Sequence, residues 1–313
     1  MVDKNKLAGT IYAVAAFSLW GILPIYWKFL KKVDSIEILA YRILWAFVFF
    51  ITLIFIQNRF KELKQSIADK KTRILLIIAA ILIGFNWFLY VWAVNHNKIV
   101  EASMGYYINP LLSVVLGVVF LKEKLKTEQI IAFFIAITGV LIMILRYGKI
   151  PYIALALAIM FGSYGLVKKL VKIKSLVSLT IETFLLVPVS LLIILSREIH
   201  GKGVISNNNW LFLFLLIFGG VLTALPLFFF VKSTKKIKLS SIGFIQYLSP
   251  SLNLLIGIFI YKEIFTKTHL ISFLFIWIAL LIFSISNIKE MMVKNGEEQN
   301  QLKNNSSVNN IHS

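Results

Sequence analysis

Two ionisable side chains interrupt long apolar segments, and they are the first candidates for chemistry. Arg42 lies in ILAYRILWAFVFFITLIFI, residues 38–56, and Glu182 lies in the apolar segment 176–196. A charge inside a bilayer costs at least about 2.5 kcal/mol, so it persists where it faces a partner or a polar cavity. The forked donors of Arg42 suit an anionic or carboxylate-bearing substrate. Glu182 is a candidate proton acceptor for proton coupling, because desolvation favours the neutral form of a carboxylate.

Each charge also has a structural explanation. Arg42 could extend toward the outer headgroups or bond to carbonyls at a helix break. Glu182 could lie near the cytoplasmic face, neutralised by the lysines among residues 168–174. Both explanations stay open on sequence grounds.

Aromatic and amide side chains cluster beside helix breakers such as Pro24, Pro110 and Pro250. Proline frees a backbone carbonyl in a membrane helix, which is tolerated where protein or a cavity satisfies it. The alternative for each residue is a hydrogen bond between helices or a simple kink. Taken together, the cluster predicts a substrate-binding cavity lined by Arg42, Trp20, Asn86, Tyr106, Tyr107, Asn109, Tyr164, Gln246 and Tyr247.

Several kinds of chemistry have no counterpart in the sequence. The chain has no cysteine, no Gly-rich phosphate loop and no histidines at metal-ligand spacing. No set of nucleophile, base and acid stands out. We therefore expect no cofactor, no metal and no enzymatic activity, although an intramembrane enzyme stays open as a third class.

The composition indicates the elements that must position these residues. The 313 residues are 59% hydrophobic and 15% charged, with mean hydropathy +0.84. This is too little polar material to cover a soluble globule, so the chain is predicted to be an all-α integral membrane protein. We expect ten transmembrane helices, at 7–27, 36–56, 74–94, 101–121, 128–146, 151–167, 176–196, 210–231, 240–261 and 268–288.

The charge distribution predicts orientation. The net charge is +19, but the basic residues lie in short clusters between apolar runs, so we expect the lipid bilayer as partner and no nucleic acid. With the N-terminus inside, the inner segments hold 22 Lys and Arg and the outer loops hold 10. The positive-inside rule then places both termini in the cytoplasm.

An internal repeat appears at an offset of 140 residues. YINPLLSVVLGVVFLKEKL (107–125) aligns without a gap to YLSPSLNLLIGIFIYKEIF (247–265), and Arg42 aligns with Glu182. Five helices per half is an odd number, so the halves must be inverted relative to each other, as in many secondary transporters. We predict repeats over 1–147 and 148–290, followed by a disordered cytoplasmic tail over 291–313. Inversion would put Arg42 and Glu182 at opposite depths, which argues against a direct ion pair.

Several stretches resemble RarD-type permeases of the EamA branch of the drug/metabolite transporter superfamily. They include LWGILPIYWKFL (19–30), EILAYRILW (37–45), NWFLYVWAVN (86–95), EASMGYYINP (101–110) and LSSIGFIQYLSP (239–250). The resemblance implies ten helices, two EamA repeats and a place in the bacterial inner membrane.

These observations together predict a secondary active permease or exporter. Its substrate would be a small metabolite or drug-like molecule, moved by alternating access between the inverted repeats. The alternative is a membrane scaffold or accessory protein that transports nothing.

Overall fold

The structure is a computed structural model that describes residues 4–262, 267–286 and 289. Ten helices of the described part are long and apolar enough to cross a membrane, which confirms the ten predicted spans. The tail over 291–313 lies outside the described residues. The spans are α1 (Lys4–Phe29), α2 (Ser35–Ile56), α4 (Lys70–Asn95), α5 (Ile99–Leu121), α6 (Thr127–Tyr147), α7 (Tyr152–Leu170), α8 (Ser175–Ile199), α9 (Trp210–Thr234), the pair α10 (Leu239–Gln246) and α11 (Leu248–Phe259), and the helix Lys267–Ser286.

Two local features differ from the sequence-based expectation. The basic connection 57–73 contains a short helix, α3 (Phe60–Ala68), whose apolar residues Phe60, Leu63 and Ile67 follow helical spacing. The ninth span is divided at Tyr247 into α10 and α11. Pro250 weakens the helix at this point, because it has no N–H to donate to the carbonyl four residues earlier.

The helices repeat at the predicted offset of 140 residues. α2 begins at residue 35 and α8 at 175, α4 at 70 and α9 at 210, and α5 at 99 and α10 at 239. α6 begins at 127, and residues 267–286 of its counterpart are helical in the described part of the chain. The alignment extends to an unusual backbone conformation, since Lys122 and Lys262 both have positive φ, 54° and 56°. The chain is therefore two five-helix repeats, inverted because each contains an odd number of spans.

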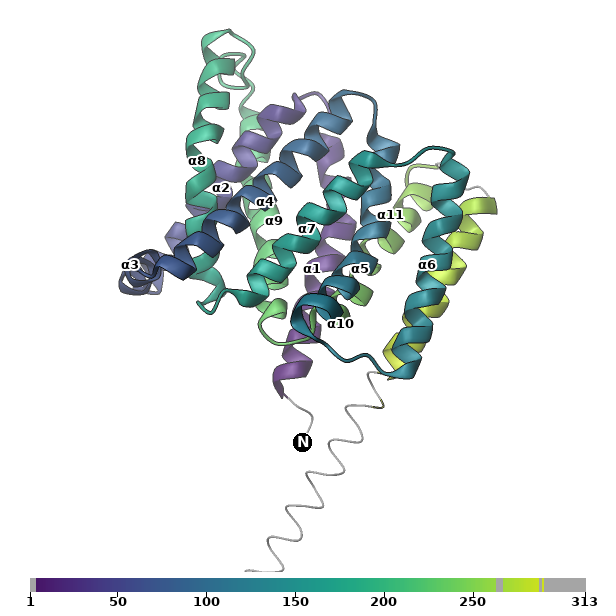
Figure 1. Cartoon of the computed structure of the whole chain (residues 1–313). Coiled ribbons are helices and arrows are strands. Elements are labelled where there is room, and N and C mark those ends of the chain that lie inside the picture. Colours follow the sequence, from purple (N-terminus) through teal and green to yellow (C-terminus); the bar gives the residue numbers. More distant parts are fainter. Residues whose placement is uncertain (1–3, 263–266, 287–288, 290–313) are drawn as a thin grey trace, which may run out of the picture.

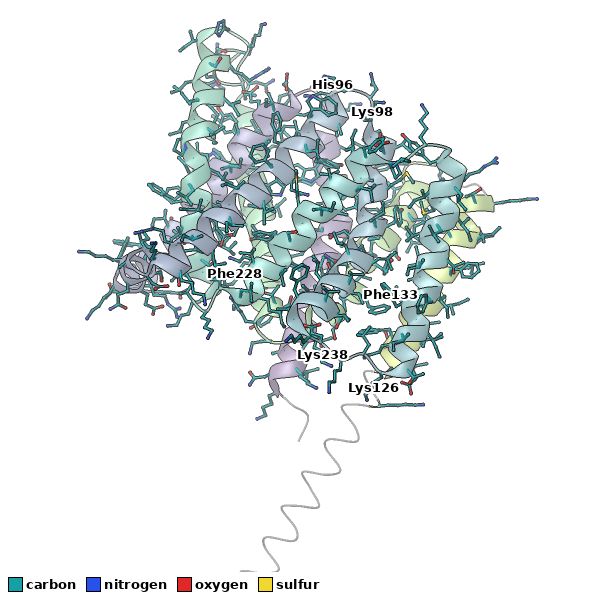
Figure 2. The ribbon with its side chains drawn as sticks, in the orientation of Figure 1. His96, Lys98, Lys126, Phe133, Phe228 and Lys238 are labelled. Carbon is teal, nitrogen blue, oxygen red and sulfur yellow. The ribbon has the colours of Figure 1, made fainter. Side chains whose placement is uncertain are left out.

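Equivalent helices of the two repeats lie against each other. α2 packs on α8 and α5 on α10, while α6 and the helix Lys267–Ser286 run side by side at one edge (Figure 1). The Tyr247 hydroxyl donates to the carbonyl of Tyr107, its own counterpart, at 3.2 Å. We call the end at which α1 begins the N-terminal face. Lys126 and Lys238 lie at this face, and His96 and Lys98 lie at the opposite face (Figure 2).

Gly220 marks the closest approach of α9 to α2. A Cβ at this position would lie 2.2 Å from the Cβ and 2.9 Å from the Cα of Trp45. We expect Gly220→Ala to lower the free energy of unfolding by about 1–3 kcal/mol, because backbone must move to relieve the overlap. Thermal unfolding in detergent measures this. Gly165→Ala is the matched control, since its nearest neighbours are side-chain tips at 3.3 and 3.4 Å. Equal stability of the two variants would contradict the expectation.

Candidate functional site

Arg42 points toward the protein interior, where both repeats contact it. It lies seven residues after the start of α2, near the opposite face, and its side chain is half-buried. Its Nε donates to the Thr223 hydroxyl on α9 at 2.9 Å. The guanidinium carbon lies 4.7 Å from the ring centroid of Trp27 on α1 and 5.8 Å from that of Trp87 on α4. Indole faces stabilise a cation by about 0.5–2 kcal/mol, but they do not neutralise it.

The two terminal nitrogens of Arg42 remain available. Within the described part of the chain, the guanidinium forms no ion pair and no hydrogen bond other than that to Thr223. The Tyr90 and Tyr106 side chains also lie near Arg42, and their rings are 6.0 Å apart. A planar pair of free donors beside aromatic walls can bind one carboxylate with two parallel hydrogen bonds.

Glu182 lies at the other depth, seven residues after the start of α8 at the N-terminal face. Its side chain is fully buried, and its Oε1 forms an ion pair with Lys168 Nζ on α7. Ser178 donates to Oε1 at 2.6 Å, and Tyr164 donates to Oε2 at 3.1 Å. Arg42 and Glu182 therefore have different partners. The Glu182 carboxylate is neutralised by one of the lysines that the sequence analysis considered.

The other candidate residues fall into separate sets. Trp20 packs on Phe17, Phe161 and Phe230, with ring centroids 5.4 to 5.8 Å apart. Tyr107, Tyr247 and Gln246 lie where α5 meets α10, and Gln246 accepts a hydrogen bond from Ser113 at 3.1 Å. They join the two repeats.

The two asparagine candidates have different surroundings. Asn86 donates to the Leu157 carbonyl at 2.9 Å and thereby joins α4 to α7. Asn109 is buried, and its amide oxygen has no hydrogen-bond partner in the described structure. The candidates thus do not form one contiguous cluster by direct contact. Tyr106 is the one that shares the surroundings of Arg42.

Sequence reasoning missed several residues of both charged sites. Trp27, Tyr90 and Thr223 surround Arg42, and Ser178 donates a hydrogen bond to Glu182. Helical spacing could have identified Ser178, which lies four residues before Glu182 on the same helix face. Thr223 carries no such signal, because it is 181 residues from Arg42.

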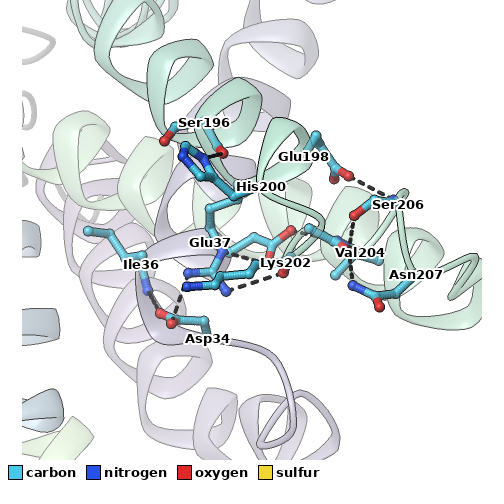
Figure 3. Close-up of polar contacts among 12 residues, drawn as sticks. Asp34, Ile36, Glu37, Ser196, Glu198, His200, Lys202, Val204, Ser206 and Asn207 are labelled. Atoms are coloured by element: carbon cyan, nitrogen blue, oxygen red, sulfur yellow. Dashed lines mark hydrogen bonds and ion pairs between the residues drawn. The ribbon is translucent and has the colours of Figure 1, made fainter.

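An ion-pair network connects the repeats at the opposite face. Arg197, near the end of α8, contacts Glu37 at 3.1 Å and Asp34 at 3.0 Å. Glu37 also accepts from the Val204 backbone N–H at 2.8 Å. Figure 3 shows Asp34 and Glu37 facing the loop that follows α8. This outer network, which we define as Asp34, Glu37 and Arg197, ties the start of α2 to the end of α8.

The N-terminal face has two clefts at the other ends of these helices. One, of about 320 Å³, is lined by residues of both charge signs, among them Glu62, Asp69 and Lys172. The second, of about 430 Å³, lies between α1, the end of α2, the start of α8 and the end of α9. No group of three or more His, Asp or Glu side chains suited to a metal ion occurs among the described residues.

Comparison with known proteins identifies the family. The model of the EamA-like transporter family matches residues 7–145 and 149–285. The chain is 45% identical over 293 residues to the uncharacterized transporter YojE of Bacillus subtilis (strain 168), covering 92% of this chain and 97% of that protein. It is 37% identical over 288 residues to protein RarD of Escherichia coli (strain K12), covering 92% and 97%.

A solved crystal structure shares the fold. Its TM-score is 0.68 at 15% sequence identity, and the match covers 90% of this chain and 98% of that chain. The ten apolar helices and the bacterial relatives together indicate a multi-pass inner-membrane transporter rather than an enzyme. The chain belongs to the EamA-like transporter family of the drug/metabolite transporter superfamily, with RarD-type permeases among its relatives.

Proposed function

We propose that the protein is a secondary active transporter of small carboxylate-bearing or otherwise anionic solutes. The N-terminal face lies in the cytoplasm, because the positive-inside rule assigns it 22 of the 33 Lys and Arg residues. The solute moves by alternating access between the inverted repeats, and Glu182 couples transport to protons. No nucleotide drives the cycle.

The observation that carries this proposal is the unpaired charge of Arg42. In the described structure the guanidinium has aromatic and hydroxyl neighbours but no carboxylate in contact. An unpaired cation within a span is unfavourable, so it is retained where a ligand supplies the opposite charge. Thr223 belongs to the second repeat and Arg42 to the first, so both halves contribute to the site. Relative motion of the halves would therefore change it.

The two faces differ in a way that suits an inward-open conformation. At the opposite face, the outer network joins α2 to α8. By the offset of 140, Lys174 corresponds to Asp34 and Gln57 to Arg197. These two residues line the cleft of about 430 Å³ at the N-terminal face and are not joined to each other in the described structure, where Lys174 pairs with Glu62. Transport requires an alternate state in which the opposite face is open and the N-terminal face is closed.

Accessibility of single cysteines tests alternating access. The chain has no native cysteine, so no background needs to be removed. We expect Trp87→Cys, at a half-buried position beside Arg42, to react with a membrane-impermeant maleimide from either side of the membrane. Cysteines at exposed Lys61 and Asn207 are the controls for the two faces. Reaction of Trp87→Cys from one side only, or from neither, would contradict alternating access and favour the scaffold function.

Weakening the outer network should shift the population of states. We expect Arg197→Gln to increase labelling of Trp87→Cys from the opposite face by about 5- to 30-fold, because ion pairs to two carboxylates are lost in one state. Arg146→Gln is the matched control, since Arg146 is exposed near the same face at the end of α6. Unchanged labelling in Arg197→Gln, or an equal increase in both variants, would show that the network does not close this face.

A further inference from the structure

The charged residues that line the larger cleft at the N-terminal face are all cations. Eleven described residues line this cleft, and none of them carries a carboxylate. The neighbouring cleft contains Glu62 and Asp69 besides its lysines, so the separation of charge is a property of this cleft and not of the whole face. We call it the basic cleft and define its charged lining as Arg59, Lys174, Lys232, Lys235 and Lys236.

These cations are largely without acidic partners. Lys174 pairs with Glu62 at 2.7 Å at the rim. The other four form no ion pair within residues 4–262 and 267–286, and all four are half-buried. Like charges gathered in a concave, partly desolvated site repel one another and attract an anion. The positive-inside rule accounts for basic residues on this face, but it does not account for their grouping in one cleft.

Several contacts hold these cations in place. Lys235 donates to the backbone carbonyls of Lys168 and Val171, at the end of α7. Lys232 lies over the rings of Tyr12 and Phe228, 4.9 and 4.5 Å from their centroids. Pre-positioned donors lose less conformational entropy when they bind a ligand.

The start of α8 and the pKa of Lys235 also favour an anion in the basic cleft. α8 begins in the basic cleft, and in the described structure the side chain of its N-cap residue, Lys174, makes no capping hydrogen bond. The amide groups of a helix N-terminus favour anions. Burial, followed by the nearby charge of Lys168, lowers the pKa of Lys235 to about 7. An anion in the cleft would offset this repulsion and stabilise the charged lysine.

The shape and walls indicate the chemistry of the occupant. A cleft of about 430 Å³ has room for a phosphate group and part of its substituent. Ile173, Leu176 and Phe228 add apolar wall beside the cations.

The geometry points to a phosphate-binding site in the basic cleft, which takes either the headgroup of an anionic lipid or a free phosphate ester. Arg59, Lys232 and Lys236 hold the phosphate oxygens, and the first turn of α8 faces them. The site lies apart from Arg42 and is read out by equilibrium binding. A negative result in the binding experiment therefore leaves the transport proposal unaffected. A negative result in the transport experiments likewise leaves the phosphate site unaffected.

Binding to the purified full chain in detergent tests the site. The probes are dioctanoyl-phosphatidylglycerol, glycerol 3-phosphate and, as a lipid without net charge, dioctanoyl-phosphatidylcholine, each titrated by calorimetry. We expect saturable 1:1 binding of at least one phosphate monoanion or dianion. Binding of the phosphatidylglycerol alone identifies a lipid headgroup, and binding of glycerol 3-phosphate identifies a free ester. Binding of neither, or equal affinity for phosphatidylcholine, would overturn the proposal.

A charge-matched pair of variants locates the site. We expect Arg59→Gln/Lys232→Gln/Lys236→Gln to weaken binding at least about tenfold, because three charge-assisted contacts are lost. Lys61→Gln/Lys64→Gln/Lys70→Gln removes the same charge from exposed positions on the same face and should change affinity less than about twofold. An equal effect of the two triple variants would reduce the binding to nonspecific attraction and overturn the site. If the first variant unfolds, Arg59→Lys/Lys232→Arg/Lys236→Arg must retain binding, and loss of binding in that folded variant would also overturn the site.

Discussion

Replacing Arg42 by alanine is expected to abolish transport while leaving the fold intact. The two terminal nitrogens are free to bind a substrate carboxylate, and each charge-assisted hydrogen bond contributes about 1.5–3 kcal/mol. Loss of both should lower the transport rate in reconstituted vesicles by about 100-fold or more. Substrates for the assay come from a panel of carboxylate metabolites screened by thermal shift on the purified protein.

Stability separates a binding role from a structural one. Arg42 has no carboxylate partner among the described residues, so Arg42→Ala removes an unfavourable charge and should leave the melting temperature unchanged or raise it. A guanidinium that held a broken helix together would instead be needed for stability. Arg42→Lys keeps the charge but loses the planar fork, and we expect intermediate activity. Full transport by folded Arg42→Ala would end the anchor role.

Glu182→Gln is expected to remove the response of transport to an imposed pH gradient. The carboxylate is fully buried and shared among Lys168, Ser178 and Tyr164, so its protonation would reorganise a contact between α7 and α8. A neutral amide cannot take up that proton. The measurement is uptake into vesicles with and without a pH difference. Unchanged dependence on the gradient would exclude Glu182 as the coupling group.

The same substitution also affects stability, and a double variant separates the two effects. Glu182→Gln leaves Lys168 buried without its counter-charge, which should cost about 3–5 kcal/mol. Glu182→Gln combined with Lys168→Met removes both charges and should recover most of that stability. We expect the double variant to remain insensitive to the pH gradient. Recovery of gradient dependence together with stability would show that the ion pair is only structural.

Periodicity and composition were sufficient to predict the helices, but they did not predict every break within a helix. The spans follow from apolar length, because a bilayer admits few alternatives to a helix of about 20 residues. Pro110 and Pro250 occupy equivalent positions, yet α5 continues through Pro110 whereas the ninth span is divided at Tyr247. Both helices therefore contain a proline at the equivalent position. Neighbouring helices decide whether the freed carbonyl is accommodated within the helix or at a break.

The sequence by itself determined the membrane class, the ten helices, the repeat at an offset of 140 and the two unusual charges, Arg42 and Glu182. Each of these features can be recognised from consecutive residues or from one fixed offset along the sequence. Only the tertiary structure decided that Thr223 contacts Arg42 and that Lys168 pairs with Glu182. The physical reason is that side-chain partners depend on how inverted repeats cross, and helix packing in lipid carries no periodic signal for it.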